Sequence, residues 1–466
     1  MPSFPPALRD AFERRFGIDT RALAALRVAL GVLLLVDIAR RVASIRAFYT
    51  DSGILPRHAL VADYSELVRL SVHTLSGAAW FQYLLAGVAA LAALALLAGY
   101  RTRLATLVSL VLLISVHVRN PVFLNGGDAL LRRLLFWSLF LPLGERWALD
   151  ASSNARERVA SAAAVALLVQ VVVVYWVNAA FKLRSDVWLA GDALRYVFRL
   201  DQYTWLLGDV LAGHPALLTV LSVAWMGLLA ASPFLIVLTG WRRTLFATAF
   251  IGAHLGMAVT MQLYLFPFVS VAALLPFLPA GVWDRVEDRT GRLRERVLAR
   301  VPTRTVSRGW RPFSPPTRRR LVTAVVTLLL LGALLWNAMA LGLVPAPNED
   351  VGDGSWTMFT GPPTNDLSVA VEGTTADGER VDPLRGGAFE PGHDASSYPS
   401  ERWRRYFLTK WRAGENFTHL GPYLCARWDR AHADELRHVV VTATVEHVSI
   451  DGPGSTSERV LADHAC

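Results

Sequence analysis

Long uncharged apolar runs dominate the first 344 residues and constrain the fold more than any other feature. A run of about 18 or more apolar residues can cross the hydrocarbon core of a bilayer. The sequence contains nine candidate spans, at residues 22–39, 77–99, 104–119, 129–143, 159–179, 215–239, 244–263, 265–280 and 321–344. We therefore expect an α-helical multi-pass membrane bundle, in which the fourth span is the least typical because it is short and basic at its start.

Charge is distributed unevenly along the chain, whose net charge is +9. Residues 345–466 contain 11 Lys and Arg against 19 Asp and Glu, a net charge of −8, which leaves +17 for the preceding part. Basic residues of the membrane part are expected to fix its topology, so nucleic-acid binding is not indicated. The loop 284–320 has twelve arginines against four acidic residues and is therefore predicted to be cytoplasmic.

Strict alternation of spans from that loop predicts three segments. They are a cytoplasmic N-terminal segment at 1–20, a transmembrane domain at 21–344 and an extracytoplasmic C-terminal domain at 345–466. The alternative topology merges spans seven and eight or omits span four, which would invert part of the map. Either way, we expect a multi-pass protein of the cell membrane.

The C-terminal segment has the pattern of a small α+β or β-rich domain. Residues 438–450 alternate as strands do, and 400–411 indicate an amphipathic helix or strand rich in arginine and aromatic residues. We expect this domain to pack on the outer loops. The only cysteines, Cys425 and Cys466, lie in it and either form one disulfide or remain free thiols, and their spacing indicates no metal site.

Lys182 is the most informative single residue. It and Lys410 are the only lysines among 47 Lys and Arg residues, and a desolvated ammonium can release a proton that a guanidinium retains. Lys182 ends the fifth span and shares a helical face with Tyr175 and Asn178. It is either a neutral-amine base or a lysine whose stem extends from the helix end to the membrane interface.

Other polar residues within the spans are candidates because an ionisable group in a membrane usually faces a cavity or a partner. His254 is one of them, although a lone buried histidine is more often a packing residue. Asp37 is expected to pair with Arg40 or Arg41 at the membrane edge. Asp128 is placed to cap the helix that follows it. The remaining candidates are Arg27 and His117.

Five stretches in their order along the chain resemble one known family. They are FYTDSGILPR (48–57), RNPVFLNGGDALLRRLLFWSLFLPLGERWALD (119–150), YWVNAAFKLRSDVWLAGDAL (175–194), HLGMAVTMQLYLFPFVSVAALLPFLP (254–279) and SWTMF (355–359). Together they resemble the membrane domain shared by vitamin K-dependent γ-carboxylases and the prokaryotic HTTM (horizontally transferred transmembrane) proteins.

This resemblance implies a lyase-type carboxylase that uses a lipid quinol. In the carboxylases a lysine is thought to deprotonate reduced vitamin K, and oxygen then generates the strong base that removes a glutamate γ proton before CO₂ adds. Lys182 and His254 match the family's functional lysine and histidine. The quinol-binding candidates are Tyr175, Asn178, Trp188, Asn125, Asp128, Phe266 and Phe268.

The implied cofactor is reduced vitamin K or menaquinol, with no metal indicated. The implied partners are the membrane lipid or quinol and an extracytoplasmic protein or peptide. Two departures bear on function: Asn125-Gly126-Gly127 replaces an Asn-Asn-His stretch, and the outer domain is shorter. The rival hypothesis is therefore a non-catalytic membrane scaffold or transport-associated protein, in which the polar residues brace the bundle.

Overall fold

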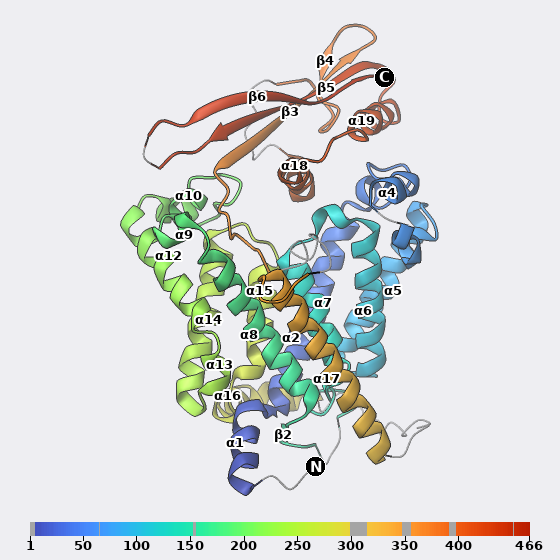
Figure 1. Ribbon diagram of the computed structural model, residues 1–466. Helices are drawn as coiled ribbons and strands as arrows, with labels where there is room; N and C mark the ends of the chain where they lie inside the picture. Colours follow the sequence, from blue (N-terminus) through green and yellow to red (C-terminus); the bar gives the residue numbers. More distant parts are fainter. Residues whose placement is uncertain are drawn as a thin grey trace.

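A helical bundle carries a small β-sheet across one end, and the N-terminal helix α1 (Pro6–Phe16) lies at the opposite end (Figure 1). The computed structural model describes residues 5–64, 66–151, 155–298, 315–346, 356–390, 398–450 and 452–466. The helices of the bundle and its loops follow α1 in chain order. They are α2 (Thr20–Val42), α3 (Ile45–Phe48), α4 (Arg57–Asp63), η1 (Glu66–Leu70), η2 (Val72–Thr74), α5 (Ala79–Ala98), α6 (Thr102–Arg119), η3 (Pro121–Phe123), α7 (Gly126–Ser138), α8 (Ala162–Lys182), α9 (Asp186–Leu189), α10 (Ala193–Val197), α11 (Gly208–Ala212), α12 (Pro215–Ala230), α13 (Phe234–Val237), α14 (Gly240–Thr260), α15 (Phe266–Leu274), η4 (Leu275–Phe277), α16 (Ala280–Leu298) and α17 (Pro315–Ala340).

Five of the described helices are long and apolar enough to cross a membrane: α2, α5, α6, α8 and α17. A sixth span is obtained if α15, η4 and α16 are taken as one segment, which bends by 109°. The predicted nine spans are therefore not confirmed. The helix α7 has only 13 residues and α12 only 16, while α14 has 21 but includes two arginines, a histidine and several threonines and glycines that reduce its apolar character.

Local sequence signals explain where these helices begin and end. The side chain of Asp19 accepts a hydrogen bond from the backbone N–H of Arg21 at the start of α2. The helix α5 ends at Gly99, whose φ of +76° favours a residue without Cβ. At α7, the N-cap is Asn125, and Asp128 completes a reciprocal capping box from the third position of the helix instead of preceding it as predicted.

The predicted basic loop 284–320 lies partly in helix α16, which continues to Leu298. Its residues 299–314 lie outside the described part of the chain. In Figure 1, α16 lies at the same end of the bundle as α1, opposite the sheet. This arrangement agrees with the predicted separation of the basic loop from the C-terminal domain, whereas the side of the membrane on which each lies stays a prediction.

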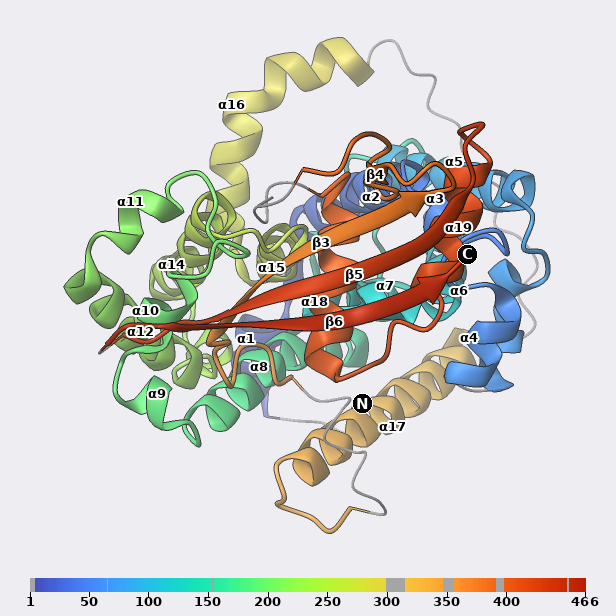
Figure 2. The same ribbon diagram turned by 90° about the horizontal axis from the view of Figure 1, so that it is seen from above.

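The C-terminal domain is built on a four-stranded antiparallel sheet of order β4-β3-β5-β6. Its strands are β3 (Asn365–Thr375), β4 (Arg380–Val381), β5 (Leu436–His447) and β6 (Ser455–Ala465), and its helices are α18 (Glu401–Ala413) and α19 (Leu420–Asp429). Seen from above, the sheet crosses the bundle with α18 beneath it (Figure 2). The predicted strand at 438–450 and the amphipathic segment at 400–411 correspond to β5 and α18. A separate two-residue pair, β1 (Ile18–Asp19) with β2 (Arg158–Val159), joins loops of the bundle.

The C-terminal domain shares its hydrophobic core with the loops of the bundle. Phe48 of α3 is fully buried, with its ring 4.8 Å from that of Trp403 on α18 and 4.9 Å from that of Phe123. The same cluster includes Phe407 of α18 and Val439 of β5, both fully buried. The C-terminal domain thus packs on these loops of the bundle, as expected, whereas their position on the outer side of the membrane stays a prediction.

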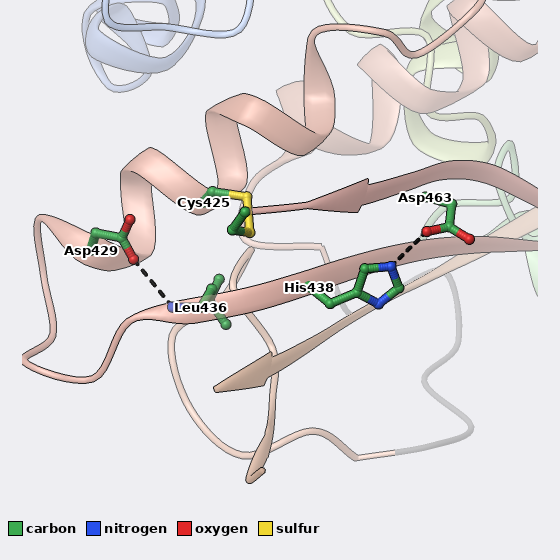
Figure 3. The surroundings of a disulfide bond; sticks show 6 residues. Cys425, Asp429, Leu436, His438 and Asp463 are labelled. Atoms are coloured by element: carbon green, nitrogen blue, oxygen red, sulfur yellow. Dashed lines mark hydrogen bonds and ion pairs between the residues drawn. A yellow bond between two sulfur atoms is a disulfide. The ribbon is translucent and has the colours of Figure 1, made fainter. Parts of the chain in front are cut away.

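A disulfide closes the C-terminal domain (Figure 3). Cys425 of α19 bonds to Cys466, which follows β6, so the alternative of two free thiols is not what the structure shows. Close to this bond, His438 of β5 lies 2.6 Å from Asp463 of β6. The disulfide and the strand pairing together fix α19 against the sheet.

We expect removal of the disulfide to destabilise the C-terminal domain. The bond joins residues 41 positions apart, and closing a loop of ~40 residues stabilises a fold by about 4 kcal/mol in the chain-entropy model. Cys466→Ser should lower the unfolding temperature of this domain, measured by heating followed by limited proteolysis. A reductant should act in the same way on the wild type and have no effect on the variant. An unchanged unfolding temperature in both cases would contradict this account.

The orientation can be tested with single cysteines at the two ends. Asp377 and Asp288 are both exposed, and Asp377→Cys in the C-terminal domain should react with a membrane-impermeant maleimide on intact cells. Asp288→Cys on α16 should react only after lysis. The reverse pattern would invert the predicted topology.

Candidate functional site

A cavity of about 1040 Å³ lies between α8, α12 and α14 near the end of the bundle that faces the sheet. Its wall is mainly apolar and includes both Lys182 and His254. From α18, Leu408, Thr409 and Arg412 also line it, so the C-terminal domain covers one side. The two predicted catalytic residues, which are 72 positions apart in the sequence, thus share one cavity.

Lys182 is 2% exposed and bound by backbone oxygens. Its Nζ donates to the carbonyl oxygens of Met358 at 3.0 Å and Phe359 at 2.6 Å, and it lies 3.9 Å from the ring centroid of Trp188. No carboxylate forms an ion pair with it in the described part of the chain. Two acceptors leave the third position of the amine without a hydrogen-bond partner.

Neighbouring side chains hold the same short stretch, residues 356–359, which we call the clamped segment. The amide of Asn178 donates to the carbonyl oxygens of Trp356 and Met358, both at 2.9 Å. The indole of Trp188 donates to the carbonyl of Phe359 at 2.7 Å. Together these side chains therefore satisfy three of the four backbone carbonyls of a segment that has no regular secondary structure of its own.

His254 is fully buried in the middle of α14. Its Nε2 lies 3.0 Å from the hydroxyl of Tyr175, while its Nδ1 has no hydrogen-bond partner among the described residues. The rings of Trp225 and Phe266 lie 5.5 Å and 5.6 Å from the imidazole in edge-on arrangements. A buried imidazole nitrogen without a partner is costly, so a ligand in the cavity could complete its hydrogen bonding.

Two polar residues on the cavity wall carried no signal in the sequence. The Oε1 of Gln202 and the hydroxyl of Tyr203 are buried without hydrogen-bond partners in the described structure. Burial raises the pKa of Tyr203, although the neighbouring Arg412 opposes this effect, so its hydroxyl keeps its proton at neutral pH. Both residues reach the cavity because the loop after α14 pairs with theirs, with the N–H of Gln262 donating to the carbonyl of Tyr203 at 2.8 Å.

Most of the other predicted quinol-binding residues lie on this cavity. Asn125 and Phe266 line it together with Tyr175, Asn178 and Trp188. Asp128 is instead occupied with the cap of α7 and lies 3.5 Å from Arg405. Phe268 is 46% exposed on the outside of the bundle and is not part of the cavity wall.

Two glycines of α14 leave part of the cavity wall without side chains. An added Cβ at Gly252 or Gly256 of α14 would meet no atom within 4 Å, and both residues line the cavity. They are therefore not required for close helix packing. Their effect is to leave the backbone surface of α14 uncovered beside His254, which gives a flat ligand room to lie against the helix.

A family model described as the HTTM domain matches residues 17–282, more than half of the chain. The chain belongs to the HTTM domain family. No match was found among curated proteins or among solved structures. The HTTM domain contains Lys182 and His254, whereas the clamped segment lies beyond the matched residues.

Loss of the Asn178 amide should release the clamped segment. Asn178→Ala removes two hydrogen bonds to backbone carbonyls, at a cost of about 1–3 kcal/mol locally. We expect faster amide hydrogen exchange in peptides covering residues 356–360, measured by mass spectrometry, with unchanged exchange in α8. The matched control is Asn337→Ala on α17, because the Asn337 amide bonds only within its own helix. Equal protection in both variants would show that Asn178 does not hold this segment.

Proposed function

We propose that this HTTM protein is a vitamin K-dependent γ-carboxylase-like enzyme that oxidises a lipid quinol in the cavity between α8 and α14. The observation that carries the proposal is the convergence of Lys182 and His254 on one largely apolar cavity of about 1040 Å³. Bound reduced vitamin K or menaquinol would supply, with oxygen, the strong base that drives proton abstraction and carboxylation of an acceptor. The acceptor is proposed to be an extracytoplasmic protein or peptide.

The cavity fits an amphiphilic quinol in size and chemistry. Ligand sites are usually apolar clefts of about 300–1,000 Å³ with a few polar groups that orient the ligand. Here three buried polar atoms have no hydrogen-bond partner among the described residues, namely His254 Nδ1, Gln202 Oε1 and the Tyr203 hydroxyl. A quinol ring offers two hydroxyls to such groups, while its isoprenoid tail suits the apolar wall and the uncovered face at Gly252.

Lys182 is arranged for proton transfer at a ring hydroxyl. A neutral amine has two N–H groups and one lone pair, and its two N–H groups would be taken by the carbonyls of Met358 and Phe359. The lone pair would then be available to accept a proton. An apolar surrounding favours this neutral form because charge is costly where water is excluded.

His254 is proposed to act as a positioning or proton-sharing partner on the opposite helix. Its Nε2 is engaged by Tyr175, which leaves Nδ1 to contact a ligand oxygen. The Tyr175 bond can also set which imidazole nitrogen carries the proton. In this arrangement Lys182 would contact the ligand from α8, and His254 would contact it from α14.

The disulfide supports an extracytoplasmic C-terminal domain, since such bonds persist mainly in oxidising compartments. On this topology the cavity lies near the outer leaflet, with α18 above it. An acceptor outside the cell would approach the cavity beside α18.

The scaffold hypothesis has its own support in the clamped segment. Lys182, Asn178 and Trp188 bind the backbone that leads into the C-terminal domain, a purely structural task. The two hypotheses differ in what they require of the lysine. A structural role requires only that the side chain donates hydrogen bonds, whereas a catalytic base must be able to release and accept a proton.

Lys182→Arg separates these requirements. We expect the variant to fold but to lose oxygen-dependent formation of quinone epoxide, because a guanidinium donates hydrogen bonds without releasing its proton. The assay uses purified protein with reduced menaquinone or vitamin K, with or without a glutamyl peptide. The loss should exceed about a hundredfold if proton transfer is abolished.

Lys410→Arg is the matched control, since Lys410 forms an ion pair with Glu415 away from the cavity and should retain activity. Full epoxide formation by Lys182→Arg would rule out the base role. No epoxide from the wild type with several quinols would favour the scaffold hypothesis.

A further inference from the structure

A second hollow lies on the lipid-facing side of the bundle, away from the quinol cavity. It is a groove of about 580 Å³ between α6 and α7, beneath η1. Its wall is largely apolar and includes Leu110, Ile114 and Phe136. The groove opens onto the exposed apolar face of α6, where Leu107, Val111 and Ile114 are 46%, 46% and 44% exposed.

Two adjacent guanidiniums lie at one end of this groove. Arg132 and Arg133 of α7 both line it. Arg133 forms no hydrogen bond or ion pair within the described part of the chain, and its guanidinium carbon lies 4.3 Å from the centroid of the Trp356 ring. Arginines in a membrane helix normally pair with an anion or a carbonyl. Among the described residues, Arg133 therefore has no anion or carbonyl as a partner.

Nearby charges do not supply this partner, because the surrounding cluster is itself positive. Arg41 pairs with Asp37 at 2.7 Å, and Arg41 and Arg405 both lie 3.5 Å from Asp128. The described carboxylates of this cluster are thus already engaged by other arginines. Addition of Arg132 and Arg133 leaves an excess of positive charge at the groove.

His117 cannot compensate for this excess. Arg41 approaches its Nε2 at 3.0 Å and Arg132 approaches its Nδ1 at 2.8 Å. A neutral imidazole has only one acceptor nitrogen, so it can accept from one of the two guanidiniums only. A protonated imidazole would accept from neither and would add a further positive charge.

We propose that this groove binds an anionic phospholipid, with the phosphodiester at Arg132 and Arg133 and an acyl chain along Leu110, Ile114 and Phe136. Guanidiniums recognise phosphate oxygens through charge-assisted hydrogen bonds, and basic pockets between membrane helices are known to hold lipid headgroups. The site is separate from the proposed catalytic cavity and does not depend on quinol chemistry.

The shape of the groove favours a lipid over a soluble anion. Its walls are apolar except at the basic end, and it continues onto the surface of α6 that faces the hydrocarbon. Arg132 and Arg133 also border a more polar hollow beneath the C-terminal domain. A soluble anion would enter from that side, which makes the two sources distinguishable.

The test is lipid binding to the purified full chain in detergent, followed by native mass spectrometry. Dioleoyl phosphatidylglycerol should bind at defined stoichiometry, whereas dioleoylglycerol, which lacks phosphate, should not. Arg133→Gln should weaken binding about tenfold, the effect of losing one charge-assisted hydrogen bond. Ile114→Trp should also weaken it by filling the groove while keeping both arginines. The charge-matched control is Arg242→Gln at the opposite end of the bundle, which should bind as the wild type does.

Competition with glycerol 1-phosphate identifies the source of the phosphate. No displacement of phosphatidylglycerol at equal concentration supports a lipid site. Displacement with similar affinity would overturn the proposal in favour of a soluble anion entering below the C-terminal domain. Unchanged phosphatidylglycerol binding in both Arg133→Gln and Ile114→Trp would exclude the groove as the site.

Discussion

The hydrogen bonds from α8 and α9 to the backbone of residues 356–359 connect the two parts of the molecule. Lys182, Asn178 and Trp188 donate to carbonyls of a segment that follows the last described helix of the bundle. Buried carbonyls without partners are costly, so these side chains make an irregular segment tolerable at the edge of the bundle. The same contacts close one side of the cavity and fix the lysine amine. The structural role of these residues therefore coincides with the chemical role that we propose for them.

Packing and charge reinforce this connection at the other side of the C-terminal domain. Phe48 and Trp403 belong to one hydrophobic cluster although they come from different parts of the chain. Beneath them, Arg405 of α18 reaches Asp128, which caps α7. The start of α7 is therefore tied both to the cavity, through Asn125, and to the C-terminal domain. A displacement of α18 would therefore also displace residues of the cavity wall.

Features governed by local spacing could be predicted from the sequence. The helical period places Tyr175, Asn178 and Lys182 on one face, and all three line the cavity. The expected ion pair of Asp37 is made with Arg41, four residues away.

Features that depend on distant or global packing could not be predicted. The number of spans is one of them, because the apolar pattern indicates nine whereas five or six described helices are long and apolar enough to cross a membrane. Another is Phe268, which faces outward although Phe266, two residues away, faces the cavity.

The hydrogen bonds between α8 and the clamped segment also determine when the site can form during biogenesis. The partners of Asn178 are 178 and 180 positions further along the chain, so α8 is synthesised long before the carbonyls that it binds. Until then the Lys182 amine lacks these acceptors, and the cavity lacks its outer wall. Assembly of the site is thus a late event that depends on delivery of the C-terminal segment to the correct end of the bundle, and a chain interrupted before residue 356 would contain the catalytic candidates without the enclosure that orients them.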